Sequence, residues 1–428
     1  MTKPLWLQRC WRCVQHAMWF YGLSGLLVFA VPPQEISLKL AGTWSGLGKG
    51  NAAKVVVAGH YAFLGAHQDG CFIIDVSNPS APTLVGRYTN ATDAADIDVL
   101  GPYAYVVDSS RSLHIVDVSD PAKPVGVGRH ETYAYAAKAV GQYVFLLGGE
   151  GLEDFRILDV GNPQEPVVRS TFAWTDGSSP SGIAVSGGRV FISDRHGGLG
   201  IFDVRSATSP YLIGKRSQST GILGVHVSGS YAYLPYDGLG LEIVPVSDPG
   251  SPILARRIDT DGYAQAVFVS GGYAYVADGS AGIVVIDVRH PLNPQRVGNY
   301  KTTGLAVDVF VAGGNVFVAD NLQGLVILSG APLPEGPPQI DAQPEDLRFV
   351  TGSKMESYTW EQSGAGWRSL MSSIRFNPNR WGCWTLPVFH QTWPCICVNL
   401  TSISSIHAPA FMSLTSAIDC LRFGRPGS

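Results

Sequence analysis

The sequence carries little charge and, over most of its length, almost no cysteine. Lys, Arg, Asp and Glu make up 15% of the 428 residues, the formal net charge is −4, and no basic or acidic run occurs. These absences exclude a nucleic-acid-binding surface that depends on counterion release. Between residues 14 and 382 the only cysteine is Cys71. The middle of the chain therefore has no internal disulfide, and its stability must come from packing and sheet closure.

The apolar run near the N-terminus is short for a membrane span. Ala17–Val31 has fifteen uncharged residues, whereas a spanning helix needs about 20. Basic residues precede the run, and Val28-Phe29-Ala30 suits a cleavage site. We predict a signal peptide over residues 1–31, with an uncleaved signal anchor as the alternative; only the anchor would bring membrane attachment. Either one predicts export, to a secreted, cell-surface or periplasmic location.

Short runs of Val, Ile and Tyr recur along the chain. YAFLGAHQDGCFIIDVSNPSAP begins at Tyr61, and similar stretches begin at Tyr103 and Tyr273. Equivalent positions are 42, 42, 44, 42, 42 and 42 residues apart, at Asp75, Asp117, Asp159, Asp203, Pro245, Asp287 and Ser329. This is the blade length of propellers, and short β-branched runs between turns exclude a two-helix repeat. We predict an all-β, seven-bladed β-propeller of four-stranded antiparallel blades.

The same pattern predicts how each blade is built and how the ring closes. Proline recurs seven residues after the register position in six copies, where it ends the third strand, and the register Asp is expected to bond turn N–H groups. The seventh copy stops near Ser329 without a fourth strand, while an unpaired strand, Ile36–Trp44, precedes the first copy. We expect this N-terminal strand to complete the last blade beside residues 306–329 and so close the ring.

The repeats resemble a known family. LHIVDVSDP and IVVIDVRHP are similar to the LVIVD repeat of exported bacterial and archaeal propellers, and the resemblance covers residues 36–329. It implies architecture rather than biochemistry, because the matching residues are core and turn positions. Pro245 and Ser329 depart from the usual Asp. The expected domains are the signal segment 1–31, the propeller 32–330 and a tail, 331–428.

The tail differs in composition from the repeats. PPQIDAQPEDLRFVTGS resembles the opening strands of a bacterial immunoglobulin-like domain, but alternating strands do not follow Ser353. Five Trp and four Cys follow instead. We interpret residues 331–428 as a linker with a truncated or frame-shifted, poorly ordered domain. A small disulfide-stapled module is the alternative.

Charged side chains on the innermost strands are a candidate site, because these strands line a propeller's central channel. Asp96, Asp308 and His226 supply oxygen and imidazole donors for a divalent metal ion, the one cofactor that the sequence suggests. The alternative is a water-filled channel in which Asp neutralises Lys54 and Lys138.

The loops between the fourth and first strands, and between the second and third, form one face that is a second candidate. Function concentrates on loops held by a rigid scaffold. The predicted binding residues on this face are His130, Trp174, Arg195, His196 and Tyr236. Asp-Gly pairs on the same face are interpreted as turn chemistry. GLGKG at Gly46–Gly50 lacks the spacing and the Ser/Thr of a phosphate loop.

Two functions compete. The first is an exported or cell-surface scaffold, without catalysis, that binds a protein or glycan partner of the cell envelope through this loop face. The second is a metal-dependent hydrolase or lactonase with its centre in the channel; it rests on analogy with other propellers, and a fold does not imply a function.

Overall fold

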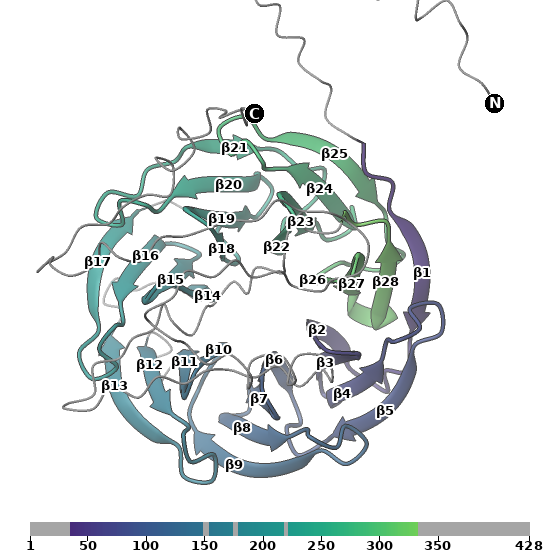
Figure 1. Ribbon diagram of the computed structural model, residues 1–428, viewed down its shortest axis with the longest axis vertical. Helices are drawn as coiled ribbons and strands as arrows, with labels where there is room; N and C mark the ends of the chain where they lie inside the picture. The colour runs from purple at the N-terminus through teal and green to yellow at the C-terminus, as the bar shows by residue number, and fades with distance from the viewer. Residues whose placement is uncertain (1–34, 149–153, 174–178, 218–220, 333–428) are drawn as a thin grey trace, which may run out of the picture. The chain divides into compact units, whose positions relative to one another are not determined.

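The chain winds into seven four-stranded antiparallel sheets arranged as blades around one axis (Figure 1). A computed structural model describes residues 35–148, 154–173, 179–217 and 221–332. Each blade places its strands in chain order from the axis outward, and we call them A to D; the last blade takes its outermost strand from the N-terminus. In these ranges the helical structure is one 3₁₀ turn, Asn321–Gln323, and no helix is long and apolar enough to cross a membrane.

The first four blades follow directly in the chain. Blade 1 consists of β2 (Asn51–Ala58), β3 (Tyr61–His67), β4 (Gly70–Asp75) and β5 (Thr83–Tyr88). Blade 2 consists of β6 (Ala94–Leu100), β7 (Tyr103–Asp108), β8 (Ser112–Asp117) and β9 (Val125–Glu131). Blade 3 consists of β10 (Ala136–Val140), β11 (Tyr143–Leu147), β12 (Asp154–Asp159) and β13 (Val167–Ala173). Blade 4 consists of β14 (Pro180–Ser186), β15 (Arg189–Asp194), β16 (Gly198–Asp203) and β17 (Tyr211–Arg216).

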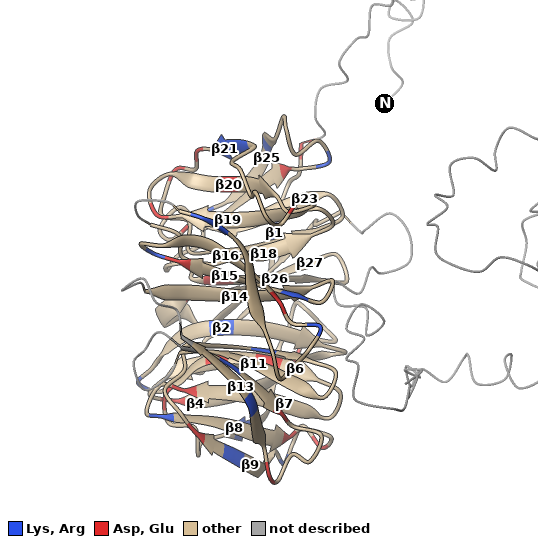
Figure 2. Cartoon of the chain, turned by 90° about the vertical axis from the view of Figure 1, so that its left-hand side faces the viewer, with Lys and Arg blue, Asp and Glu red and all other residues tan. Residues whose placement is uncertain are grey.

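The last three blades complete the ring. Blade 5 consists of β18 (His226–Ser228), β19 (Tyr231–Tyr236), β20 (Gly240–Pro245) and β21 (Arg256–Ile258). Blade 6 consists of β22 (Ala266–Ser270), β23 (Tyr273–Ala277), β24 (Ile283–Asp287) and β25 (Gln295–Tyr300). Blade 7 consists of β26 (Asp308–Ala312), β27 (Asn315–Ala319), β28 (Leu325–Ser329) and β1 (Lys39–Trp44). In side view the strands run across the ring from one loop face to the other (Figure 2).

The predicted closure by the N-terminal strand is confirmed. β1 pairs antiparallel with β28, from Lys39 opposite Ser329 to Trp44 opposite Leu325. Ahead of the strand, the Ile36 N–H donates to the Val297 carbonyl at 2.7 Å, so the segment also contacts blade 6. The two ends of the propeller therefore hold each other in a single sheet.

The core lies between neighbouring blades. Strands B and C are buried along nearly their whole length, and each apolar cluster draws on two adjacent blades. Between blades 3 and 4, for example, the rings of Phe155 and Phe202 lie 5.7 Å apart. One repeat cannot bury its own apolar faces, which is why the units must form a ring.

The turns behave as the repeat predicts. The register carboxylate accepts the N–H two residues on in blades 1 to 4 and 6, for example Asp75 from Ser77 at 2.8 Å and Asp117 from Ser119 at 2.9 Å. This confirms the turn role assigned to these Asp residues. The predicted signal segment, residues 1–31, and the residues beyond 332 lie outside the described ranges, and so do the interpretations placed on them.

A further repeated contact joins blade to blade through strand D. Gly128 lies against the next blade's C–D turn, where an added Cβ would sit 1.7 Å from the Pro163 carbonyl oxygen. Gly86 and Gly214 make the same approach to Pro121 and Pro249. In blade 3 the position is Ser170, whose hydroxyl donates to the Ala207 carbonyl at 2.8 Å. The glycines therefore allow the backbones of neighbouring blades to touch.

Candidate functional site

The charged residues predicted to line the channel do meet there. Lys54 on β2 places its ammonium 3.6 Å from Asp96 Oδ1 on β6 and 3.5 Å from Asp308 Oδ1 on β26. Both carboxylates are buried and the lysine is partly exposed to the channel. The channel has a volume of 1370 Å³. One cation thus joins the inner strands of blades 7, 1 and 2.

The second oxygen of each channel carboxylate bonds to the neighbouring blade. Asp308 accepts the Val55 N–H at 2.9 Å, and Asp96 accepts the Ala137 N–H at 2.7 Å. Asp98 repeats the pattern, accepting the Ala139 N–H at 2.8 Å while Lys138 lies 3.0 Å from its other oxygen. These carboxylates therefore stabilise the junctions between blades, and the neutralised channel remains the simpler interpretation.

His226 lies on the other side of the channel, among aromatic rings. Its ring centroid is 4.8 Å from that of Phe268, which is 4.6 Å from that of Phe310. Burial lowers the pKa of His226 to about 3, and the positive charges of Lys138 and Lys54 add to the effect. Within the described part of the chain, no group of three or more His, Cys, Asp or Glu side chains is placed to hold a metal ion. The metal site at Asp96, Asp308 and His226 stays a prediction that this geometry does not favour.

The buried carboxylates predict a pH-dependent stability. Burial raises the pKa of Asp96 to about 6, although Lys54 opposes the shift. A raised pKa means that the folded chain holds this proton more tightly, so the contribution is complete below pH about 4 and is lost as the pH rises through 6. Relative to Asp96→Asn, the wild type should lose roughly 1–3 kcal/mol of unfolding free energy between pH 4 and 7. Urea denaturation across this range measures the difference.

The control is the exposed Asp248→Asn, whose stability should run parallel to that of the wild type. Parallel curves for Asp96→Asn and the wild type would show that Asp96 does not titrate in this window.

The loop face formed by the D–A and B–C loops is held by repeated carboxylates at the ends of the B strands. Asp278 accepts from Thr260 Oγ1 at 2.7 Å and from the Gly262 N–H at 2.8 Å. Asp320 accepts from Thr302 Oγ1 at 2.9 Å and from the Gly304 N–H at 3.0 Å. Equivalent residues in blades 2 and 4 also accept loop N–H groups, namely Asp108 and Asp194. Each bond fixes a D–A or B–C loop to the blade.

The GLGKG segment, Gly46–Gly50, is likewise held to blade 1 by a carboxylate. The N–H groups of Gly48, Lys49 and Gly50 all point at Asp69 Oδ2, at 2.8, 3.0 and 2.7 Å. Asp69 also pairs with Arg87 at 3.1 Å. The glycine-rich segment therefore surrounds a carboxylate of its own chain rather than a phosphate.

The predicted binding residues differ in their exposure to solvent. Arg195 and His196 are exposed on the loop face, as expected for contact residues. His130 is half-buried on β9, and burial lowers its pKa. Trp174 lies outside the described residues. Tyr236 requires a correction: it is 3% exposed, because its ring packs in the core between blades 4 and 5 beneath the Arg257 guanidinium.

Large apolar side chains on the same face were missed from the sequence. Tyr263 is 60% exposed and Leu322 is 70% exposed. Leu239, in the B–C loop of blade 5, and Leu305, in the D–A loop before β26, are also exposed. We call these four residues, from blades 5 to 7, the loop patch. Single Leu and Tyr residues in loops carry no periodic signal, so the sequence alone did not distinguish them from core residues.

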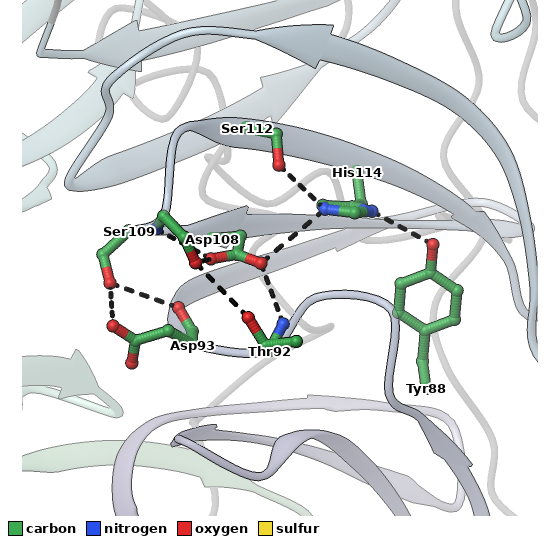
Figure 3. Close-up of polar contacts among 8 residues, drawn as sticks. Tyr88, Thr92, Asp93, Asp108, Ser109, Ser112 and His114 are labelled. Atoms are coloured by element: carbon green, nitrogen blue, oxygen red, sulfur yellow. Dashed lines mark hydrogen bonds and ion pairs between the residues drawn. The ribbon is translucent and has the colours of Figure 1, made fainter.

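A buried polar cluster in blade 2 superficially resembles catalytic machinery (Figure 3). His114 Nε2 lies 2.9 Å from Ser112 Oγ and 3.8 Å from Asp108 Oδ2, and its Nδ1 lies 3.1 Å from Tyr88 Oη. In a hydrolase triad the serine and the carboxylate bond opposite nitrogens of the histidine. Here both face the same nitrogen, so the cluster does not activate Ser112 as a nucleophile.

Seven four-stranded blades with one face of fixed loops define a scaffold-type β-propeller repeat protein. The LVIVD repeat model matches residues 49–90, 91–132, 177–216, 223–260, 261–302 and 303–328, more than half of the chain. The chain therefore belongs to the LVIVD repeat family. Blade 3 is not matched, yet it has the same four strands as the others.

Solved propellers share the fold at low identity. The β-propeller domain of Cps50 (Swd1) from Myceliophteria thermophila is 12% identical, with a TM-score of 0.54 over 68% of this chain and 99% of that one. The Pan2 WD40 domain of Neurospora crassa is 13% identical, with a TM-score of 0.53 over 70% of this chain and 98% of that one. No curated protein matches the sequence. These likenesses concern the fold alone.

Proposed function

We propose that this protein is an exported or cell-surface binding scaffold whose loop face holds a protein or glycan partner of the cell envelope. The observation that carries the proposal is the loop patch: Leu239, Tyr263, Leu305 and Leu322 are exposed on neighbouring loops of that one face. Exposed apolar and aromatic side chains gathered on one surface are typical of interaction sites.

The loops of the patch support one another. The N–H groups of Gly279 and Ala306 bond each other's carbonyls at 3.1 and 3.0 Å, joining blade 6 to the loop that bears Leu305. Tyr263 packs near Gly238, in the loop that bears Leu239. Loops that are already ordered lose less conformational entropy on binding.

The opposite face differs. Its A–B hairpins turn at glycines with positive φ, such as Gly59 and Gly101, and offer no large side chain at that position. Among the described residues, the exposed large apolar side chain in its C–D turns is Leu292, at 66%. Of the remaining exposed ones, Tyr135 lies in the D–A loop that leads into β10, and the others lie on strand D or, for Ile253 and Leu254, lead into β21. The apolar loop surface is therefore concentrated on one face.

A paired substitution tests the proposal. Immobilised full-length protein should retain a partner from an envelope extract, or the labelled protein should bind a glycan on an array. Tyr263→Ser/Leu322→Ser should weaken retention by roughly tenfold or more, since removing contact anchors costs about 1–2 kcal/mol each. Leu292→Ser, matched to Leu322 in exposure, should bind like the wild type. Equal retention by the double variant, or no retention by the wild type, would refute the proposal.

A further inference from the structure

One register position carries arginine in three blades and has a different partner in each. Arg87, Arg129 and Arg257 lie on strand D, directly opposite Phe72, His114 and Glu242 on strand C. Arg87 pairs with Asp69, and Arg257 donates to Glu242 Oε1 at 3.0 Å. In the described part of the chain no carboxylate forms an ion pair with Arg129. Blade 2 therefore has the cation of this arrangement without its anion.

A pocket lies beside Arg129. It has a volume of 680 Å³ at the junction of blades 1 and 2, beside the loop that follows β5. It includes no Asp or Glu, and its polar lining comes from Tyr88, Thr89, Asn90, Thr92, His114 and Arg129. Arg129 is exposed on its wall, whereas His114 and Tyr88 are buried in it. The pocket thus offers one charge, which is positive, among hydroxyl and amide groups.

The polar cluster of Figure 3 holds His114 in a fixed orientation, so that its uncharged imidazole lines the pocket. Ser112 and Asp108 face Nε2, which suits a proton on that nitrogen, and Nδ1 is then free to accept from the Tyr88 hydroxyl. Burial lowers the pKa of His114 despite the nearby Asp108, and Arg129 lowers it further. The imidazole therefore does not compete with Arg129 for an anion.

We infer that this pocket binds the carboxylate of a hydroxylated acid, a uronic acid sugar being the form that its lining fits best. The planar guanidinium of Arg129 suits bidentate pairing with a carboxylate. Asn90 and Thr92 line the same pocket, and their amide and hydroxyl groups would bond ring hydroxyls. The inference rests on the proposed function in one respect: the pocket opens beside a D–A loop of the loop face, and it defines the chemistry of a glycan partner there.

Binding of D-glucuronate to the full-length protein, measured by calorimetry, tests the inference. Glucose offers the same ring without the carboxylate and should not bind. Arg129→Gln should weaken glucuronate binding at least tenfold. The control, Arg87→Gln, removes the same charge at the equivalent position, and it should leave the affinity unchanged because Arg87 already has its carboxylate.

Two further ligands distinguish a glycan from a small hydroxy acid as the source of the carboxylate. A uronate oligosaccharide that binds more tightly than lactate supports a glycan, whereas equal binding of lactate assigns the pocket to small hydroxy acids and overturns the sugar. Equal binding of glucose, undiminished binding by Arg129→Gln, or binding of an aspartyl peptide in place of glucuronate would overturn the inference as a whole.

The two proposals fail separately. Tyr263→Ser/Leu322→Ser leaves the pocket untouched and should keep glucuronate binding. Loss of partner capture without loss of glucuronate binding is the result expected if both proposals hold. Glucuronate binding by a wild-type protein that captures no partner refutes the scaffold proposal alone, and partner capture without glucuronate binding refutes the pocket alone.

Discussion

Deleting Ile36–Trp44 is expected to abolish soluble folding. The segment provides strand D of blade 7, so its loss exposes the whole edge of β28. It also removes Ile36 and Leu38 from the core of blades 6 and 7, and Trp44, whose ring centroid lies 5.0 Å from that of Phe72. The soluble fraction after expression and the thermal unfolding of any soluble product measure the effect.

Leu40→Ser is the matched control for this deletion. Leu40 lies in the same strand but is exposed, so the substitution should leave folding intact. A deletion variant that is soluble and unfolds in one cooperative transition would show that the ring does not depend on its N-terminal strand.

Glu242→Ala should lower the free energy of unfolding by about 3–5 kcal/mol, because removing one partner of a buried ion pair leaves uncompensated charge. Glu242 is fully buried on β20 and lies between two cations from different blades. Arg216 Nη1 is 2.9 Å from its Oε2, and Arg257 Nε is 3.0 Å from its Oε1. Chemical denaturation of the variant and the wild type measures the loss.

The comparison is an exposed pair of the same kind. Arg296 donates to Asp261 at 3.0 Å, but Asp261 is 64% exposed, so Asp261→Ala should lower the free energy of unfolding much less than Glu242→Ala does. Similar losses for Glu242→Ala and Asp261→Ala would mean that burial does not strengthen the first pair.

Repetition made most of the fold predictable. A register of about 42 residues identified seven blades, and the absence of a fourth strand after Ser329 identified Ile36–Trp44 as its replacement. The turn role of Asp75 and its equivalents also followed, because the bond to the N–H two residues on is local. Such features depend on neighbours in the chain or on a pattern seen several times.

The site was less predictable because its contacts join distant residues. Tyr236 ends a YAYLPY strand like an exposed loop residue, but the Arg257 guanidinium covers it. The carboxylates Asp108, Asp194, Asp278 and Asp320 do recur at repeat spacing, and that signal was open to detection. Arg129 gave no such signal, since what distinguishes it is that it forms no ion pair with a carboxylate among the residues that the structure describes.

The sequence by itself determined the architecture of this protein: an all-β ring of seven blades, closed by its first strand. Each repeat has too much apolar surface to bury alone, and every copy of the repeat shows this property in its sequence. The tertiary structure decided which charges neutralise each other, which aromatic rings face solvent and which arginine faces an open pocket. These outcomes depend on contacts between side chains of different blades. The spacing of those residues along the chain does not specify how far apart they lie in space.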